Sequence, residues 1–249
     1  MSSEFTQHAI IFRVGRFREA DCWVRLLTPG HGILSAFAFG GSKSRRRFCG
    51  CLDSFNHVLF KIKPVRSGRY LCLQEGVLLN RFSRMRADSA RTGMAVNCIK
   101  FLEQVQLGEQ GAAEAFDLLL GSMNHLEEAE RISSFFPLLF RAKTVCDQGY
   151  SPALHACAGC GKSLREMSFP RFSIDGGQVY CQNCSPPEGK SLRIHPEAVR
   201  FLETIVTRGP FLEHPQLSRR AQQDFYSLVD AFIEYHLGLV WEGNRFRRI

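Results

Sequence analysis

Hydrophobic and polar residues alternate along the first third of the chain in short runs, and turn residues separate the runs. In the run VLFKIK, Val58, Phe60 and Ile62 fall on one face of an extended strand, whereas Lys61 and Lys63 fall on the other. A period of two is typical of half-buried strands. The pattern predicts five strands, over residues 8–14, 20–28, 32–40, 54–63 and 69–76. Five short strands within one small region predict a β-barrel.

The remaining two thirds carry apolar residues at helical spacing. The pattern predicts helices over residues 87–105, 112–128, 129–148, 195–206 and 217–237. Pro137 is expected to kink the third helix, because proline lacks the N–H that an interior turn requires. In the last helix His236 shares a face with Phe232 and other apolar residues, and we interpret it as a packed histidine instead of a metal ligand.

The helices are interrupted once, between Pro152 and Pro186-Pro187. We interpret them as one bundle into which a separate module is inserted. The predicted fold class is therefore multidomain, with α and β parts: a β-barrel, a helical bundle and an inserted zinc-ribbon module. The predicted division is 1–80 for the barrel, 81–150 and 191–240 for the two parts of the bundle, 151–190 for the module and 241–249 for a tail.

The inserted segment contains two Cys-x-x-Cys motifs, Cys157 with Cys160 and Cys181 with Cys184. Each motif places two thiolates on one tight corner, and two corners supply the four-sulfur tetrahedral shell that Zn²⁺ favours. Between them the turn Asp175-Gly176-Gly177 separates FPRFSI from QVY, which predicts a small β-hairpin. The sequence therefore predicts a structural zinc ion held by these four cysteines.

Other uses of the cysteines are less well supported. The start MSSEFTQH lacks the features of a secretory signal, and no apolar run is long enough to span a bilayer, so we expect a cytoplasmic protein with reduced thiols. A redox dithiol is disfavoured because a second, matching pair favours shared coordination. We interpret the six other cysteines as small apolar residues; they are Cys22, Cys49, Cys51, Cys72, Cys98 and Cys146.

A catalytic zinc site is the main alternative, since zinc deaminases combine Cys-x-x-Cys with His-x-Glu. His195-Pro196-Glu197 follows the cysteines instead of preceding them, and four thiolates would leave no open position for water. Pro196 and Glu197 also resemble a helix start, with proline at the first position and an acid in the first turn. We therefore expect no enzymatic activity.

Positive charge is concentrated at the N-terminus: residues 1–86 contain 15 lysines and arginines against 5 acids, whereas residues 87–249 contain 17 against 19. The segment GGSKSRRRFCG places four cations between the third and fourth predicted strands, where they could follow a phosphate backbone. A solvated loop is the alternative interpretation. The predicted DNA-binding residues are Lys43, Arg45, Arg46, Arg47, Arg13, Arg25, Arg66 and Arg69. We expect Trp23, Phe17, Phe37 and Phe39 to pack in the core; any that point outward would offer stacking surfaces.

The order of these motifs resembles the RecO family of bacterial DNA recombination mediators over nearly the whole chain. The resemblance lies in AIIFRVGRFREADCWVRLLTPGHG, in GGSKSRRRFCGCLDSF, in the cysteine quartet of the zinc-bearing branch and in EYHLG near the end. The matching positions in the first two segments are Glu19, Asp21, Thr28, Gly30, Gly32, Leu52 and Phe55. The tail WEGNRFRRI departs from the family pattern.

The resemblance implies an OB-fold barrel, a helical domain and a zinc module. It further implies binding of single- and double-stranded DNA and annealing of complementary strands without covalent chemistry. The expected partners are RecR, in some members RecF, and the acidic C-terminal tail of single-strand-binding protein, which RecA replaces on DNA. The expected location is the bacterial cytoplasm, at the nucleoid. The alternatives are a zinc-ribbon adaptor that binds only proteins and a zinc-dependent nucleic-acid enzyme.

Overall fold

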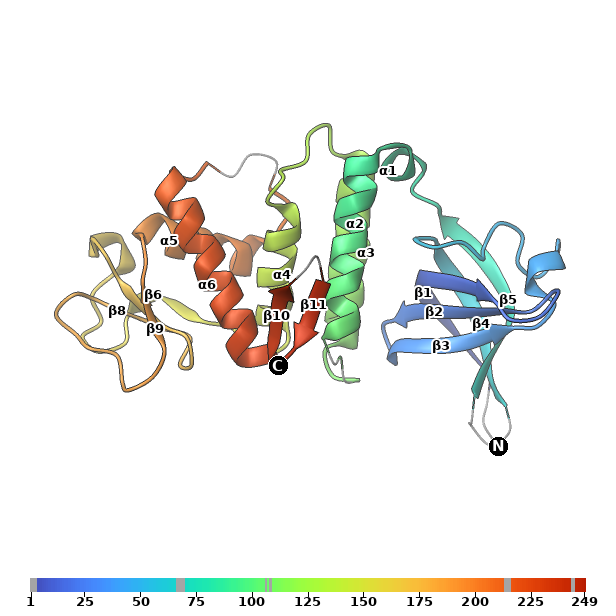
Figure 1. The fold of residues 1–249 in the computed structure, drawn as a ribbon, viewed down its shortest axis with the longest axis horizontal. Helices are drawn as coiled ribbons and strands as arrows, with labels where there is room; N and C mark the ends of the chain where they lie inside the picture. The colour runs from blue at the N-terminus through green and yellow to red at the C-terminus, as the bar shows by residue number, and fades with distance from the viewer. Residues whose placement is uncertain (1–3, 66–69, 106, 108, 213–215, 243–244) are drawn as a thin grey trace. The chain divides into compact units, whose positions relative to one another are not determined.

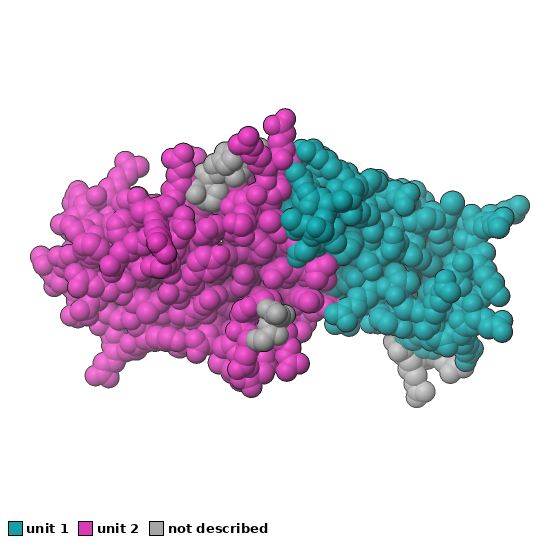
Figure 2. Space-filling view, turned by 45° about the horizontal axis from the view of Figure 1, so that its top comes forward, with its two compact units in different colours: residues 1–93, 106–128 teal, residues 94–105, 129–249 magenta. Residues whose placement is uncertain are grey.

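The structure is a computed structural model, and it describes residues 4–65, 70–105, 107, 109–212, 216–242 and 245–249. The predicted DNA-binding residues Arg66 and Arg69 lie outside the described residues. The chain forms two compact units, residues 1–93 with 106–128 (unit 1) and residues 94–105 with 129–249 (unit 2), which Figure 2 distinguishes by colour. Helix α2 (Ser89–Gln104) begins in unit 1 and continues into unit 2.

Unit 1 contains a closed five-stranded barrel, visible at the blue end of the chain in Figure 1. Its strands are β1 (Phe5–Arg16), β2 (Cys22–Thr28), β3 (Gly32–Ala38), β4 (His57–Val65) and β5 (Tyr70–Asn80). The order around the barrel is β1-β2-β3-β5-β4, with β4 closing onto β1 and with β3 parallel to β5. This arrangement is OB-like, and all five predicted strands are confirmed.

The strand alternation determines which side chains fill the barrel. The inner core takes every second residue of each strand, for example Val24 and Leu26 of β2 and Val58, Phe60 and Ile62 of β4. The connection from β3 to β4 is fixed to this core because Phe48 and Cys51 pack within it. The basic segment is therefore anchored to the barrel on both sides.

Two helices complete unit 1, α1 (Ser83–Ala87) and α3 (Ala112–Glu128). The carboxylate of Glu127 on α3 accepts hydrogen bonds from the backbone N–H groups of Arg84 and Met85, at 3.1 and 2.8 Å. It thus satisfies two of the free donors at the start of α1. Helix α3 packs against β2 and β3, where Ile10 and its register partner Leu27 are fully buried outside the inner core.

Unit 2 contains the helices α4 (Phe136–Asp147), α5 (Pro196–Arg208) and α6 (Arg219–Leu237). The prediction of a kinked helix over 129–148 is wrong: α4 begins at Phe136, and Pro137 lies in its first turn. Proline is accommodated there because the first N–H groups of a helix have no partner within the helix. The predicted helices at 195–206 and 217–237 are confirmed, and so is the packed role of His236, whose Nε2 lies 2.8 Å from the carbonyl oxygen of Ile174.

The inserted segment forms a four-stranded sheet in the order β6-β8-β7-β9 (Figure 1). Its elements are β6 (Ala153–Cys157), the short helix η2 (Leu164–Glu166), β7 (Arg171–Ser173), β8 (Gln178–Tyr180) and β9 (Ser191–Arg193). Strands β7 and β8 pair antiparallel, which confirms the predicted hairpin. The predicted fold class is confirmed, with a barrel, helices and a four-cysteine group.

The tail forms a hairpin of β10 (Leu239–Glu242) and β11 (Arg245–Arg248) that the sequence did not reveal. Trp241 and Phe246 are register partners with ring centroids 4.6 Å apart, and Phe246 packs on Phe101 of α2. The predicted domain boundaries stay a prediction. Among the described residues, every helix is too short or too polar to cross a membrane.

Candidate nucleic-acid interface and metal centre

The outer face of β1, β2 and β3 carries a row of aromatic residues that the strand register defines. Gly15 lies opposite Trp23, and Trp23 lies opposite Phe37. A Cβ atom on Gly15 would lie 2.3 Å from the Trp23 ring. Only glycine at this position therefore leaves the indole room to lie across β1.

Two residues along the strands, the same face carries a basic row. Arg13 lies opposite Arg25, and Arg25 lies opposite Ser35. The guanidinium of Arg25 donates a hydrogen bond to the Ser35 hydroxyl at 3.5 Å. Like charges directly opposite each other on neighbouring strands are unfavourable, and an anionic ligand would relieve the repulsion.

An aromatic cluster, defined by Phe17, Phe37, Phe39 and Tyr70, continues the aromatic row at the edge of the sheet. The Phe37 and Phe39 rings are nearly parallel with centroids 6.1 Å apart, and Phe17 and Tyr70 meet Phe37 edge-on at 5.3 and 5.7 Å. Together with Arg18 the cluster lines a depression of about 300 Å³. A nucleobase could stack in such a depression.

The expectation that these aromatic residues pack in the core is wrong for two of them: Phe17 is 41% exposed and Phe39 is 37% exposed. The inner face of β3 takes the small residues Ala36 and Ala38, so the phenylalanines must point outward. Trp23 and Phe37 are half-buried. The sequence contained this signal, because Ser35, Phe37 and Phe39 share one face of the strand.

The basic loop, residues 41–50, adjoins the aromatic cluster. The Arg47 guanidinium donates a hydrogen bond to the carbonyl oxygen of Phe39 at 2.5 Å and lies 5.1 Å from the Phe48 ring centroid. The backbone carbonyl of Arg47 accepts a hydrogen bond from Gly76 of β5 at 2.8 Å. Arg45 and Arg46 are exposed, with no carboxylate within 4.0 Å in the described part of the chain.

Two residues outside the predicted set position this loop. The carboxylate of Asp21 accepts a hydrogen bond from the backbone N–H of Gly40 at 2.7 Å and so fixes the turn after β3. Lys43 lies 3.9 Å from Glu19, but both side chains are largely exposed, so this ion pair holds the lysine weakly. The structure thus brings Arg13, Arg25 and the basic loop together with aromatic residues that the sequence did not assign to the site.

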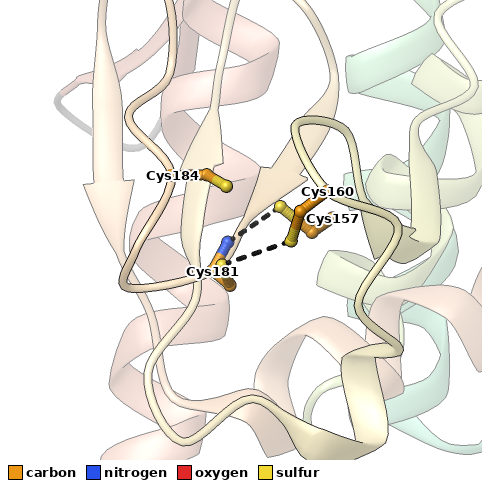
Figure 3. A group of neighbouring side chains, drawn as sticks. All are labelled: Cys157, Cys160, Cys181 and Cys184. Carbon is orange, nitrogen blue, oxygen red and sulfur yellow. Dashed lines mark hydrogen bonds between the residues drawn. The ribbon is translucent and has the colours of Figure 1, made fainter.

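The four predicted cysteine ligands converge in unit 2, as Figure 3 shows. Their sulfur atoms all lie within 4.8 Å of one another. A tetrahedral site with metal–sulfur distances of about 2.3 Å has sulfur–sulfur edges of about 3.8 Å. The Sγ atoms of Cys160 and Cys181 are 3.7 Å apart, which fits such a site. The group can therefore hold a metal ion.

Backbone N–H groups prepare the site for thiolates. Burial acts to raise the pKa of Cys157, but hydrogen bonds from the backbone of Cys181, Cys160 and Gly159 outweigh it and lower the pKa to about 6. The Cys181 N–H lies 3.3 Å from the Cys157 sulfur. Hydrogen bonds among the thiols raise the pKa of Cys184 to about 12, which is expected where neighbouring thiolates repel and no cation balances them.

Gly159 allows the two motifs to close around the site. A Cβ atom on Gly159 would lie 3.0 Å from the Cys184 sulfur, so a larger residue would push the second motif away. The interpretation of the other cysteines as small apolar residues is confirmed for five of them, which are buried, but Cys49 is exposed.

The His195-Pro196-Glu197 segment is a helix start, as predicted. The His195 side chain accepts a hydrogen bond from the Glu197 N–H and caps α5. The Glu197 carboxylate accepts hydrogen bonds from the backbone and hydroxyl of Ser218, at 3.1 and 2.6 Å, and ties the starts of α5 and α6 together. Both side chains thus serve the helices of unit 2.

The fold and the sites define a mixed α/β protein with an OB-like barrel and a four-cysteine metal-binding group. The family model described as "Recombination protein O N terminal" matches residues 1–82, and "Recombination protein O C terminal" matches residues 86–245. The chain therefore belongs to the RecO family of DNA repair proteins.

Full-length relatives agree with this assignment. The chain is 44% identical over 247 residues to "DNA repair protein RecO" of Oleidesulfovibrio alaskensis, covering 99% of this chain and 100% of that protein. It is 44% identical over 251 residues to the protein of the same name from Nitratidesulfovibrio vulgaris, with 99% and 100% covered. A more distant relative of that name, from Anaeromyxobacter dehalogenans, is 27% identical over 238 residues, with 95% and 93% covered.

Proposed function

We propose that this chain binds single- and double-stranded DNA on the outer face of its barrel and anneals complementary strands. The observation that carries the proposal is the joining of the aromatic cluster to the basic loop through the hydrogen bond from Arg47 to Phe39. Exposed aromatic rings suit the faces of unpaired bases, and the cations beside them suit phosphates. The DNA-binding residues would be Arg13, Arg25, Lys43 and Arg45 to Arg47, with Arg66 and Arg69 still predicted from sequence alone.

Annealing would follow from charge neutralisation. Two complementary strands repel each other through their phosphates, and a basic surface that holds one strand lowers this repulsion for the second. Bases stacked on the aromatic cluster would keep their pairing edges accessible. No covalent bond needs to form or break, so we propose that the chain is not an enzyme.

We propose that the metal is Zn²⁺ and that its role is structural. Four thiolates at tetrahedral spacing suit zinc, although a four-sulfur set also suits iron–sulfur chemistry. A four-thiolate shell leaves no position for a reacting water. Zinc would supply charge compensation for Cys157, Cys160, Cys181 and Cys184 and would hold β6 and the end of β8 together.

The proposed partners come from the family. With RecR, and with RecF in some members, the chain would help RecA to replace single-strand-binding protein on DNA in the bacterial cytoplasm, at the nucleoid. It would also bind the acidic C-terminal tail of single-strand-binding protein, for which a basic protein is a suitable partner. Membrane binding has no place in this proposal.

A strand-annealing assay tests the proposal. Two complementary oligonucleotides carrying a fluorescent donor and acceptor are mixed with the protein, with and without bound single-strand-binding protein. We expect faster pairing in both conditions and products of unchanged length. An absence of any oligonucleotide binding would favour a protein-only adaptor, and cut or deaminated product would favour an enzyme.

A further inference from the structure

Unit 2 contains a polar groove of about 570 Å³ between α5 and the four-cysteine module. One wall is the exposed stripe of α5, with residues at spacings of three and four: Arg200, Glu203, Thr204, Thr207 and Arg208. The opposite wall consists of His155 on β6 and of Ser163, Leu164 and Arg165 at η2. Both β6 and η2 pack against α5, so the groove lies within one unit.

The groove offers three strong cationic donors. Within the described residues, Arg165, Arg200 and Arg208 have no carboxylate within 4.0 Å, even though Glu203 lies on the same helical stripe. Arg165 and Arg208 are exposed and Arg200 is half-buried. Guanidinium groups bind phosphate oxygens through paired N–H donors, so three of them along one groove suit a chain of phosphates.

The same groove also offers acceptors. The Thr204 hydroxyl donates to the carbonyl of Arg200 at 3.0 Å, and the Thr207 hydroxyl donates to the carbonyl of Glu203 at 2.9 Å. Each hydroxyl thus turns its lone pairs, and not its proton, toward the groove. Together with the Glu203 carboxylate they could accept from amino or hydroxyl groups, which a nucleotide carries beside its phosphate.

We propose that this groove is a second binding site for single-stranded nucleic acid, separate from the barrel face. A polynucleotide fits better than an acidic peptide with apolar side chains. Leu164 is the only apolar residue among those that line the groove, and it is 2% exposed, so the groove provides no apolar socket. The inference deepens the proposed function and rests on it, because two separate sites would let one protein hold two strands.

The four-cysteine group would control this second site. Cys157 ends β6, and the turn that contains Cys160 leads directly to Ser163, whose hydroxyl caps η2 by accepting from the Arg165 N–H at 3.4 Å. A metal ion bound there would fix the module's wall of the groove. The groove therefore joins the metal to DNA binding through positioning, without a bond from metal to DNA.

The test replaces the three groove arginines with glutamine, as Arg165→Gln, Arg200→Gln and Arg208→Gln, which removes charge and keeps side-chain length. The matched control replaces Arg131, Arg219 and Arg220, which are exposed in the same unit outside the groove. The probe is a labelled oligothymidylate of about 40 nucleotides, longer than the about 4–16 nucleotides that one OB-fold covers. Its affinity is measured across salt concentrations, and annealing is measured in parallel.

We expect the slope of log affinity against log salt to fall by about 2 in the groove variant, at about 0.7 per lost phosphate contact. Annealing should slow at least about tenfold, because it needs both strands. The control should keep the wild-type slope, and equal melting temperatures of the two variants would exclude misfolding.

Two outcomes would overturn the inference. A groove variant with the wild-type slope, in a protein whose barrel variant does lose slope, would remove the groove and leave the proposed function intact. An oligoaspartate that binds wild type but not the groove variant, with no change in DNA slope, would assign the groove to an acidic protein. Failure of wild type to bind DNA at all would instead refute the proposed function.

Discussion

The barrel face and the four-cysteine module use side chains in opposite ways. On the barrel, the apolar rings of Phe17 and Phe39 point outward although the inner core is full of smaller residues. In the module, the polar sulfur atoms of four cysteines point inward and converge. The first arrangement leaves apolar surface in water, and the second gathers groups that repel one another when ionised.

Each arrangement is unfavourable without a ligand, and the nature of that ligand differs. Exposed aromatic rings beside arginines are relieved by a large partner that binds and leaves. Clustered thiolates are relieved by a small cation that stays bound and contributes to folding. The comparison indicates that unit 1 displays a reversible interface, whereas the module of unit 2 depends on a resident ion.

Loss of the resident ion should have the largest effect. Cys157→Ser removes one of four ligands, and structural zinc sites contribute about 10–16 kcal/mol to folding. We expect the module to unfold and the protein to become less soluble, while the barrel stays folded. Metal content by mass spectrometry and proteolysis of residues 151–194 would follow the change. Cys49→Ser, at an exposed cysteine outside the cluster, is the control, and a fully folded metal-free protein would refute the structural role.

Removal of the loop charges should have the next largest effect. The triple variant Arg45→Ala, Arg46→Ala and Arg47→Ala should lower the log–log salt slope for single-stranded DNA by about 2. Since counterion release contributes little near 1 M salt, affinity at 0.1 M should fall roughly a hundredfold. Melting temperature should change little, because Arg45 and Arg46 are exposed. An unaltered slope would exclude the loop from the DNA-binding surface.

The barrel should also lose stability in acid. Burial, and secondly the neighbouring His8, lower the pKa of His57 to about 4. An unfolded histidine has a pKa of about 6.5, so the unfolded chain takes up a proton that the folded barrel refuses. Stability should therefore be complete above pH 6.5 and fall by about 2 kcal/mol as the pH drops toward 4.

Denaturant unfolding at several pH values, followed through the signals of unit 1, would measure this loss. His57→Gln should flatten the pH dependence between 4 and 6.5, whereas substitution of the exposed His31 should leave it in place. A pH dependence that persists in His57→Gln would place its origin in another group.

The smallest effect should come from one ring of the aromatic cluster. Phe39→Ala should weaken single-stranded DNA binding about tenfold, since base stacking on an aromatic ring contributes about 1–3 kcal/mol. It should barely change stability, because the ring is 37% exposed. Val77→Ala, which removes a 59% exposed apolar side chain elsewhere on the barrel, is the control. Equal affinities for both variants would show that the cluster does not stack on bases.

Much of the fold could be read from local patterns. The period-two alternation located the five barrel strands, and the Cys-x-x-Cys spacing identified four cysteines that do converge. These features depend on neighbours in the sequence, so local chemistry was sufficient. The start of α4 was misplaced because apolar spacing continues before Pro137, and only the structure reveals that residues 129–135 do not join the helix.

The groove could not have been predicted, since its two walls come from residues 155–165 and 200–208. Neither segment looks like a binding site alone: α5 reads as an ordinary helix with a polar face, and Arg165 as a solvated charge. The tail was missed for a similar reason, because its hairpin depends on Phe246 packing against Phe101.

The sequence by itself determined the barrel, most of the helices, the ligand set of the metal centre and the concentration of positive charge in the first third. Those properties follow from residue type and short-range periodicity. Tertiary structure decided which aromatic residues face water, which arginines stand beside them and where α5 meets the cysteine module. Such outcomes depend on packing between segments far apart in the chain, because each side chain's exposure is set by what the rest of the fold brings against it.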